Sequence, residues 1–106
     1  MRKLGFKAAR ALFIDALKDG RIRFERRSAA QGKNLLQSGD ISPEEVIWLL
    51  RRCRGDQYEE SPHHFMPEVP CHIFKPEIHR IQWYVKGYRL SDDVFLISVH
   101  TSEWKS

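Results

Sequence analysis

Three side chains suited to proton transfer and phosphate binding lie near the C-terminal end of the sequence. Tyr84 and Lys86 stand two residues apart in an alternating polar and apolar run, and His100 ends the next apolar run. Cleaving RNA without a metal requires a base for the ribose 2′-OH, an acid for the leaving oxygen and a cation at the phosphate. Histidine, tyrosine and lysine can supply these groups. The alternative is an ordinary exposed sheet face with a histidine at a strand end.

A second constellation consists of the pairs His63-His64 and Cys71-His72. Imidazole and thiolate are good zinc ligands, but this spacing matches no common zinc finger or knuckle, and three prolines lie nearby. We therefore expect no metal and no cofactor, and we interpret His63 and His64 as exposed loop histidines. Stoichiometric zinc in purified protein would favour a metal-binding protein instead. Glycine-rich phosphate loops, nucleophile elbows and zincin motifs are absent from the sequence.

Three tryptophans form a third set that could stack on nucleic-acid bases. Trp48 and Trp83 fall on apolar faces, so we expect them in the core, whereas Trp104 lies in the tail. Cys53 and Cys71 belong to no paired motif and are expected to be reduced, with Cys53 on an apolar helix face.

The composition describes one basic domain covering residues 1–106. Apolar residues make up 42% of the chain, too many for a disordered protein, and the mean hydropathy of −0.53 without a long apolar run excludes a membrane span. Charged residues interrupt the N-terminal apolar stretch, so it does not read as a signal peptide, and we expect a cytoplasmic protein. The net charge of +4 favours an anionic partner such as nucleic acid.

The N-terminal half has helical patterns. An apolar stripe predicts a helix over 4–17 that stops at Gly20, and alternating basic and apolar residues over 21–26 predict a short edge strand. A short helix is expected over 28–37. Ser42, Pro43 and Glu45 form a capping box that predicts another helix start.

The C-terminal half has strand patterns. Residues 55–70 read as a loop, and strands are expected over about 71–75, 80–90 and 93–100. In the second strand, Ile81, Trp83 and Val85 fall on one face, and the polar positions fall on the other. We expect the last two strands to form a hairpin with Ser98 and His100 near that polar face. The predicted fold class is α+β, with N-terminal helices packed on a small antiparallel sheet.

The order and spacing of five short segments resemble the MqsR family of toxin–antitoxin ribonucleases, and together they span nearly the whole chain. The segments are Leu17–Arg23, Asp56–Ser61, Ile73–Pro76, Trp83–Lys86 and Asp93–His100. The resemblance implies the compact RelE-like/MqsR-like fold of that family.

The resemblance also implies roles for individual residues. Tyr84 matches the family's hairpin tyrosine and Lys86 the lysine two residues later, while His100 stands where the family has a catalytic lysine. His100 is then the principal acid/base, Lys86 the phosphate binder, and Tyr84 a positioning or proton-donating group. A family glutamine on the preceding strand aligns with Cys71 or His72, which makes His72 a lesser catalytic candidate. The residues expected to bind RNA are Arg21, Arg23, Arg26, Lys75 and Gln82.

The function implied is that of a type II toxin, an endoribonuclease that cuts mRNA without a metal and inhibits translation. Attack of the 2′-OH on the adjacent phosphate would leave a cyclic phosphate. The expected partners are mRNA, a cognate antitoxin of the helix-turn-helix DNA-binding kind and, as an option, the ribosome; no membrane is expected. The alternative is a non-catalytic module that binds nucleic acid or protein on the same fold. Glu59 favours it, because family members have a lysine there.

Overall fold

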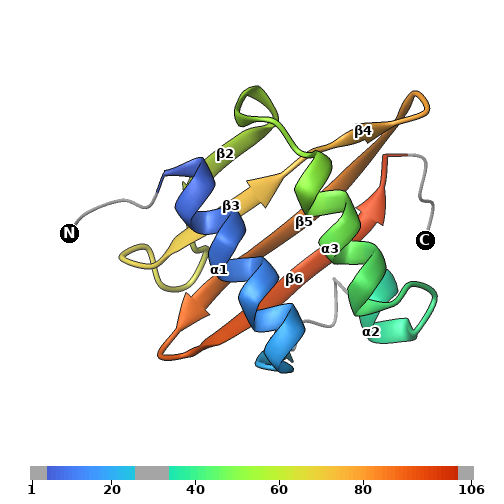
Figure 1. The fold of residues 1–106 in the computed structure, drawn as a ribbon. Helices are drawn as coiled ribbons and strands as arrows, with labels where there is room; N and C mark the ends of the chain where they lie inside the picture. Colours follow the sequence, from blue (N-terminus) through green and yellow to red (C-terminus); the bar gives the residue numbers. More distant parts are fainter. Residues whose placement is uncertain (1–4, 26–33, 103–106) are drawn as a thin grey trace.

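The fold has two layers, with helices on one face of a single main sheet (Figure 1). It was analysed as a computed structural model that describes residues 5–25 and 34–102. The elements are α1 (Phe6–Asp19), β1 (Ile22–Phe24), α2 (Leu35–Ser38), α3 (Pro43–Arg52), a 3-10 turn (Gly55–Gln57), β2 (Tyr58–Pro62), β3 (Pro70–Phe74), β4 (Glu77–Ile78), β5 (Ile81–Leu90) and β6 (Asp93–Thr101). The expected α+β class is confirmed.

The strand order is β1-β6-β5-β3-β2, and the short β4 pairs with β5. Neighbours are antiparallel except β1, which runs parallel to β6 and places Ile22 opposite Val94. The expectation of a wholly antiparallel sheet was therefore wrong, and the sheet is mixed. A turn forces two consecutive strands to run antiparallel, whereas β1 and β6 come from opposite ends of the chain and no turn connects them. The predicted edge position of β1 is confirmed.

The two long helices form where the sequence predicted them. In α1 the apolar stripe is buried, and Gly20 ends the helix in the left-handed conformation, with φ of 72° and its N–H donated to the Ala16 carbonyl. In α3 the Ser42 hydroxyl accepts the Glu45 N–H, and the Glu45 carboxylate accepts the Ser42 N–H. This capping box satisfies backbone donors that the first turn of a helix leaves unpaired.

Two expectations, the burial of Trp48 and the loop over residues 55–70, were wrong. Trp48 is 42% exposed, because the sheet contacts α3 through Val46, Ile47 and Leu50, and Trp48 lies off that stripe. Residues 55–70 contain a 3-10 turn and β2, because pairing with β3 compensates for the weak strand signal of Tyr58–Pro62. Of the short helix expected over 28–37, residues 28–33 lie outside the described ones, and the described part contains α2 from Leu35, after an Asn34 cap.

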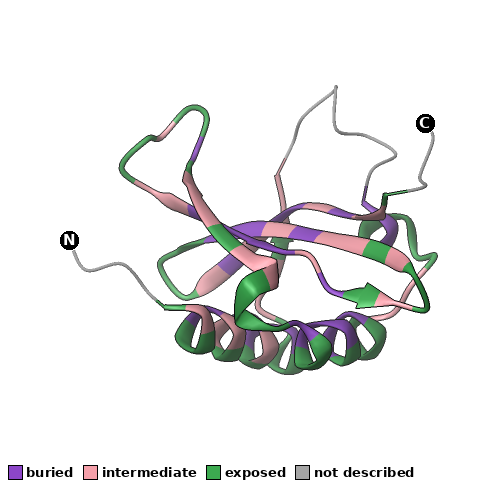
Figure 2. Cartoon of the chain, turned by 90° about the horizontal axis from the view of Figure 1, so that it is seen from above, coloured by how far each residue is buried: buried purple, intermediate pink, exposed green. Residues whose placement is uncertain are grey.

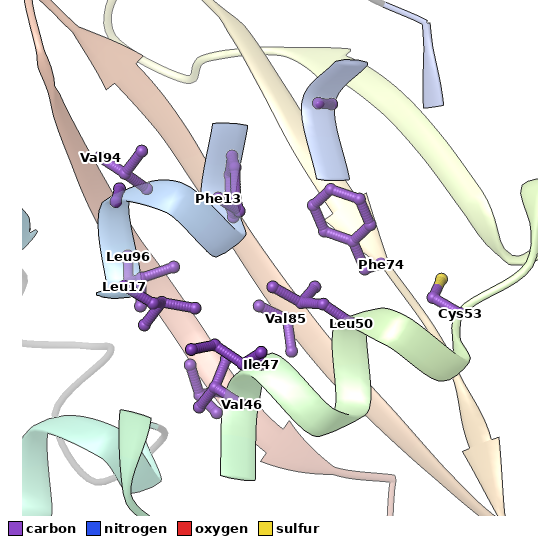
Figure 3. Packing of buried hydrophobic residues seen from close by; sticks show 13 residues of the cluster. Phe13, Leu17, Val46, Ile47, Leu50, Cys53, Phe74, Val85, Val94 and Leu96 are labelled. Carbon is purple, nitrogen blue, oxygen red and sulfur yellow. The ribbon is translucent and has the colours of Figure 1, made fainter. Parts of the chain in front are cut away.

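The core lies between the two long helices and the sheet (Figure 3). Its buried members come from α1, α3 and the central strands and include Phe13, Leu50, Phe74, Val85 and Val99. A smaller apolar cluster lies on the other face and contains Cys71, Tyr88 and Ile97, with Met66, Val69 and Phe95 packed on it. Both cysteines are free and buried. No helix within residues 5–25 and 34–102 is long and apolar enough to cross a membrane.

Candidate active site

The hairpin of β5 and β6 brings Tyr84 opposite His100 and Lys86 opposite Ser98, which confirms the predicted pairing of these strands. These residues alternate along the strands with Val85 and Val99, which are buried against the helices. Because successive side chains of a strand point to opposite faces, the four lie on the face away from α1 and α3. We call this the open face.

A β-bulge decides that His100 is on the open face. Next to the turn, Leu90 pairs with Asp93 and Gly87 pairs with Leu96. Farther along the hairpin, Lys86 pairs with Ser98 and Trp83 with Thr101, so the register shifts by one residue between Gly87 and Lys86. One additional residue, Ile97, is therefore inserted into β6. Without this bulge the first register would continue, so Tyr84 would face Val99, and His100 would lie on the helix side. Bulges re-aim side chains in this way and occur often beside active sites.

The Tyr84 and His100 rings stack, with centroids 5.2 Å apart and planes 14° from parallel. Nδ1 of His100 lies 2.9 Å from the Thr101 carbonyl oxygen. A carbonyl oxygen can only accept, so this contact places the hydrogen on Nδ1. Nε2 of the neutral ring then carries a lone pair and can accept a proton. The arrangement is that of a positioned general base.

Two lysines border this stack. Lys86 lies between Ile73 of β3 and Ser98 of β6 and forms no ion pair with a described residue. Lys75 lies opposite Tyr84, because its neighbours Phe74 and Pro76 contact Val85 and Trp83 respectively. The Lys75 ammonium is 3.2 Å from the Glu59 carboxylate, so part of its charge is compensated. Gln82 follows on the same face and is exposed.

His72 does not lie with these residues. It pairs with Gly87, which places it on the helix side, where it is 1% exposed and packs edge-on against the Phe13 ring at 5.8 Å between centroids. The structure therefore does not bring His72, the lesser catalytic candidate, together with Tyr84 and His100. The alternation of β3 puts Cys71, the other candidate for that family position, on the open face, within the smaller apolar cluster.

The helix side instead contains a polar cluster around the buried His72 that sequence reasoning missed. Nδ1 of His72 lies 2.8 Å from the Tyr58 hydroxyl oxygen, and the Glu60 carboxylate is 3.2 Å from that hydroxyl and 3.6 Å from Nδ1. Burial lowers the pKa of His72, and the nearby Glu60 opposes that shift. Burial and Glu60 both raise the pKa of the Tyr58 hydroxyl. The only sign of this cluster in the sequence is that Tyr58 and Glu60 stand two residues apart, so that in a strand both side chains point to the same face.

The predicted RNA-binding arginines lie elsewhere. Arg21 pairs with Asp19 and donates to the Asp92 carbonyl, and Arg23 pairs with Asp93 at 3.0 Å. Arg23 lies opposite Phe95, which is five residues or about 17 Å from His100 along β6. These two arginines are therefore not brought together with the Tyr84–His100 stack. Arg26 lies outside the described residues.

A second polar pair missed by sequence reasoning lies below the β2–β3 loop. Nδ1 of His63 accepts the backbone N–H groups of Phe65 and Met66, both at 3.0 Å, and Nε2 lies 2.7 Å from the Glu25 carboxylate. His63 is 3% exposed, so its interpretation as an exposed loop histidine was wrong, because these hydrogen bonds satisfy it in a buried position. His64 is exposed as expected. Within the described residues, no three His, Cys, Asp or Glu side chains gather to hold a metal ion.

An apolar groove of about 600 Å³ lies on the helix side, between α3 and the β4–β5 hairpin. Its lining residues are Ile41, Glu44, Glu45, Trp48, Leu49, Ile78, His79, Ile81 and Trp83. Trp48 and Trp83 both line this groove, so Trp83 forms part of its wall. None of the candidate catalytic residues belongs to this groove.

No protein-family model matches the chain, and a search of curated proteins finds no match either.

Proposed function

We propose that this protein is a metal-independent endoribonuclease with a RelE-like/MqsR-like fold, the toxin of a type II toxin–antitoxin pair. The observation that supports the proposal most directly is the stack of Tyr84 on His100 with Lys86 on the same face. An acid/base, an aromatic hydroxyl and a cation then lie together on one face of the sheet. The net charge of +4 agrees with an anionic substrate.

The proposed reaction follows from the arrangement of these groups. Nε2 of His100 removes the proton of the ribose 2′-OH, and the 2′-oxygen forms a bond to the adjacent phosphorus as the bond to the 5′-oxygen breaks. Lys86 stabilises the negative charge of the non-bridging oxygens. Tyr84 holds the imidazole ring and donates a proton to the departing 5′-oxygen, and the resulting tyrosinate then regains a proton from the imidazolium of His100. The products are a 2′,3′-cyclic phosphate and a 5′-hydroxyl.

The test is cleavage of a mixed RNA by purified protein in EDTA, with analysis of the new ends. His100→Ala should reduce the rate at least about a hundredfold, which is the usual contribution of general acid–base catalysis. His79→Asn is the matched control, because His79 lies in the β4–β5 turn with a positive φ of 52° that asparagine tolerates. Both variants should unfold at the wild-type temperature. Full activity in folded His100→Ala would refute the site.

The second candidate is a binding module on the same surface without catalysis. The Glu59–Lys75 ion pair favours it, because this pair offsets one of the cations beside the stack. The protein would then bind RNA in a salt-dependent manner and cut none of it. For the ribonuclease, the first candidate, we also propose a cytoplasmic location and a helix-turn-helix antitoxin that relieves toxicity when the two proteins are expressed together.

A further inference from the structure

The loop between β2 and β3 exposes a large aromatic side chain. Phe65 is 72% exposed, compared with 42% for Trp48 and 36% for Leu90, the other exposed large apolar residues in the described part of the chain. The loop rises from the sheet on the side away from α1 and α3 (Figure 2). Phe65 therefore belongs to the same side of the molecule as Tyr84 and His100.

Hydrogen bonds hold the loop that presents this ring. The buried His63 accepts the N–H groups of Phe65 and Met66, and it donates from Nε2 to Glu25, which follows β1. Further backbone bonds run from His63 N–H to the Val69 carbonyl and from Val69 N–H to the Met66 carbonyl. The backbone conformation at Phe65 is thus set before any partner arrives, which lowers the entropic cost of binding.

The loop stands on the open face, farther along β5 than the candidate active site. The His63 ring contacts Tyr88 edge-on at 4.6 Å between centroids, and Tyr88 is four residues from Tyr84 on the same face of β5. Four residues of a strand span about 13 Å. The exposed His64 ring meets the Phe65 ring edge-on at 4.8 Å, so it supports Phe65 from one side.

We propose that Phe65 is a platform on which a base of single-stranded RNA stacks while the strand continues to the phosphate at His100. This inference rests on the proposed function and adds the substrate class, an unpaired strand several nucleotides long. Every base has an apolar face that an exposed aromatic ring can cover, whereas bases inside a duplex are already stacked. Phe65 would therefore select single strands without selecting a sequence.

The experiment measures binding without cleavage. A fluorescent single-stranded oligonucleotide with 2′-O-methyl groups cannot undergo 2′-OH attack, so its anisotropy reports affinity for the protein with an intact active site. Phe65→Ala should weaken binding about tenfold, within the usual contribution of one base–aromatic stack, and Phe65→Trp should restore it. Trp48→Ala is the matched control, because it removes an exposed aromatic ring from the helix side, and it should leave the affinity unchanged.

The same oligonucleotide annealed to its complement supplies a second readout. The duplex should bind Phe65→Ala and wild type equally, because its bases are unavailable for stacking. Equal affinity of the two proteins for the single strand, or no binding of that strand by wild type at low salt, would overturn the inference. If wild type cleaves RNA but Phe65 has no effect, the proposed function stands and the platform fails. If Phe65 governs binding but no RNA is cut, the platform stands and the catalytic proposal fails.

Discussion

The Tyr58 hydroxyl and Nδ1 of His72 lie 2.8 Å apart on the face of the sheet that the helices cover. The Tyr84 and His100 rings stack on the opposite face. Each of these two histidines thus has a tyrosine partner, but of the two only His100 is on the open face. The first pair is expected to govern stability, and the second is expected to govern activity.

Tyr58→Phe should destabilise the protein without changing the activity of folded molecules. The substitution leaves buried His72 and partly buried Glu60 without the hydroxyl between them, and a lost buried hydrogen-bond partner costs about 1–3 kcal/mol. Urea unfolding measures the loss. Tyr84→Phe is the control, because its hydroxyl makes no hydrogen bond to a described residue, and it should change the free energy of unfolding by less than about 0.5 kcal/mol.

Stability should fall on acidification because of His72. Its pKa is lowered from 6.5 by burial in the folded state, so the unfolded chain takes up a proton at higher pH than the folded one. The contribution of neutral His72 is then present in full above pH 6.5 and is lost as the pH falls from 6.5 through the folded pKa. His72→Asn, which keeps an acceptor near Nδ1, should flatten this part of the stability curve. An unchanged acid slope in that variant would contradict the assignment.

Tyr84→Ala should reduce RNA cleavage more than Tyr84→Phe. The alanine variant loses both the stacked ring that positions His100 and the hydroxyl, whereas the phenylalanine variant keeps the stack. We expect the loss mainly in kcat, by about tenfold for Phe and about a hundredfold for Ala. Steady-state cleavage assays measure both. Equal effects of the two variants would show that the stack contributes nothing.

Glu59→Gln should strengthen RNA binding by releasing Lys75 from its ion pair. One added phosphate contact steepens the dependence of log affinity on log salt by about 0.7 for a single strand. Anisotropy titrations at several salt concentrations measure this slope. Asp56→Asn is the control, because it removes a similar carboxylate, which pairs with Arg54 outside the sheet. It should leave the slope closer to wild type. A slope unchanged by Glu59→Gln would argue against Lys75 as an RNA contact.

Gly87→Ala should destabilise the protein by about 1–3 kcal/mol, because the added methyl group has no space. A Cβ at this position would lie 2.6 Å from the Phe95 carbonyl oxygen and 3.1 Å from side-chain carbons of Leu96 and Phe13. Gly87 adjoins the bulge that directs His100, so cleavage should fall as well. Gly55→Ala is the control, because its nearest neighbour would be a Phe6 carbon at 3.7 Å. Chemical denaturation and cleavage assays on both variants check this.

Much of the local structure could be predicted because its causes are local. The stripe of α1, the stop at Gly20 and the Ser42 capping box act within a few residues of the chain, and so does the period-two pattern of β5. Strand β3 shows where this reasoning ends. Its residues 71–74 are all buried, because helices cover one face and the smaller apolar cluster, which includes Met66 and Val69 of the β2–β3 loop, covers the other. Burial on both faces removes the alternation from which the side of His72 could have been inferred.

The sequence by itself determined that Tyr84, Lys86 and Gln82 share one face of a strand and that Ser98 and His100 share one face of the next. Only the tertiary structure decided that these are the same face. A one-residue shift of register moves every side chain of a strand to the other face, and the inserted Ile97 makes that shift in the middle of the hairpin. Beside the bulge, a side chain at Gly87 would meet the Phe13 ring of α1, from a residue 74 positions away in the chain. Periodicity within one strand carries no information about such a contact.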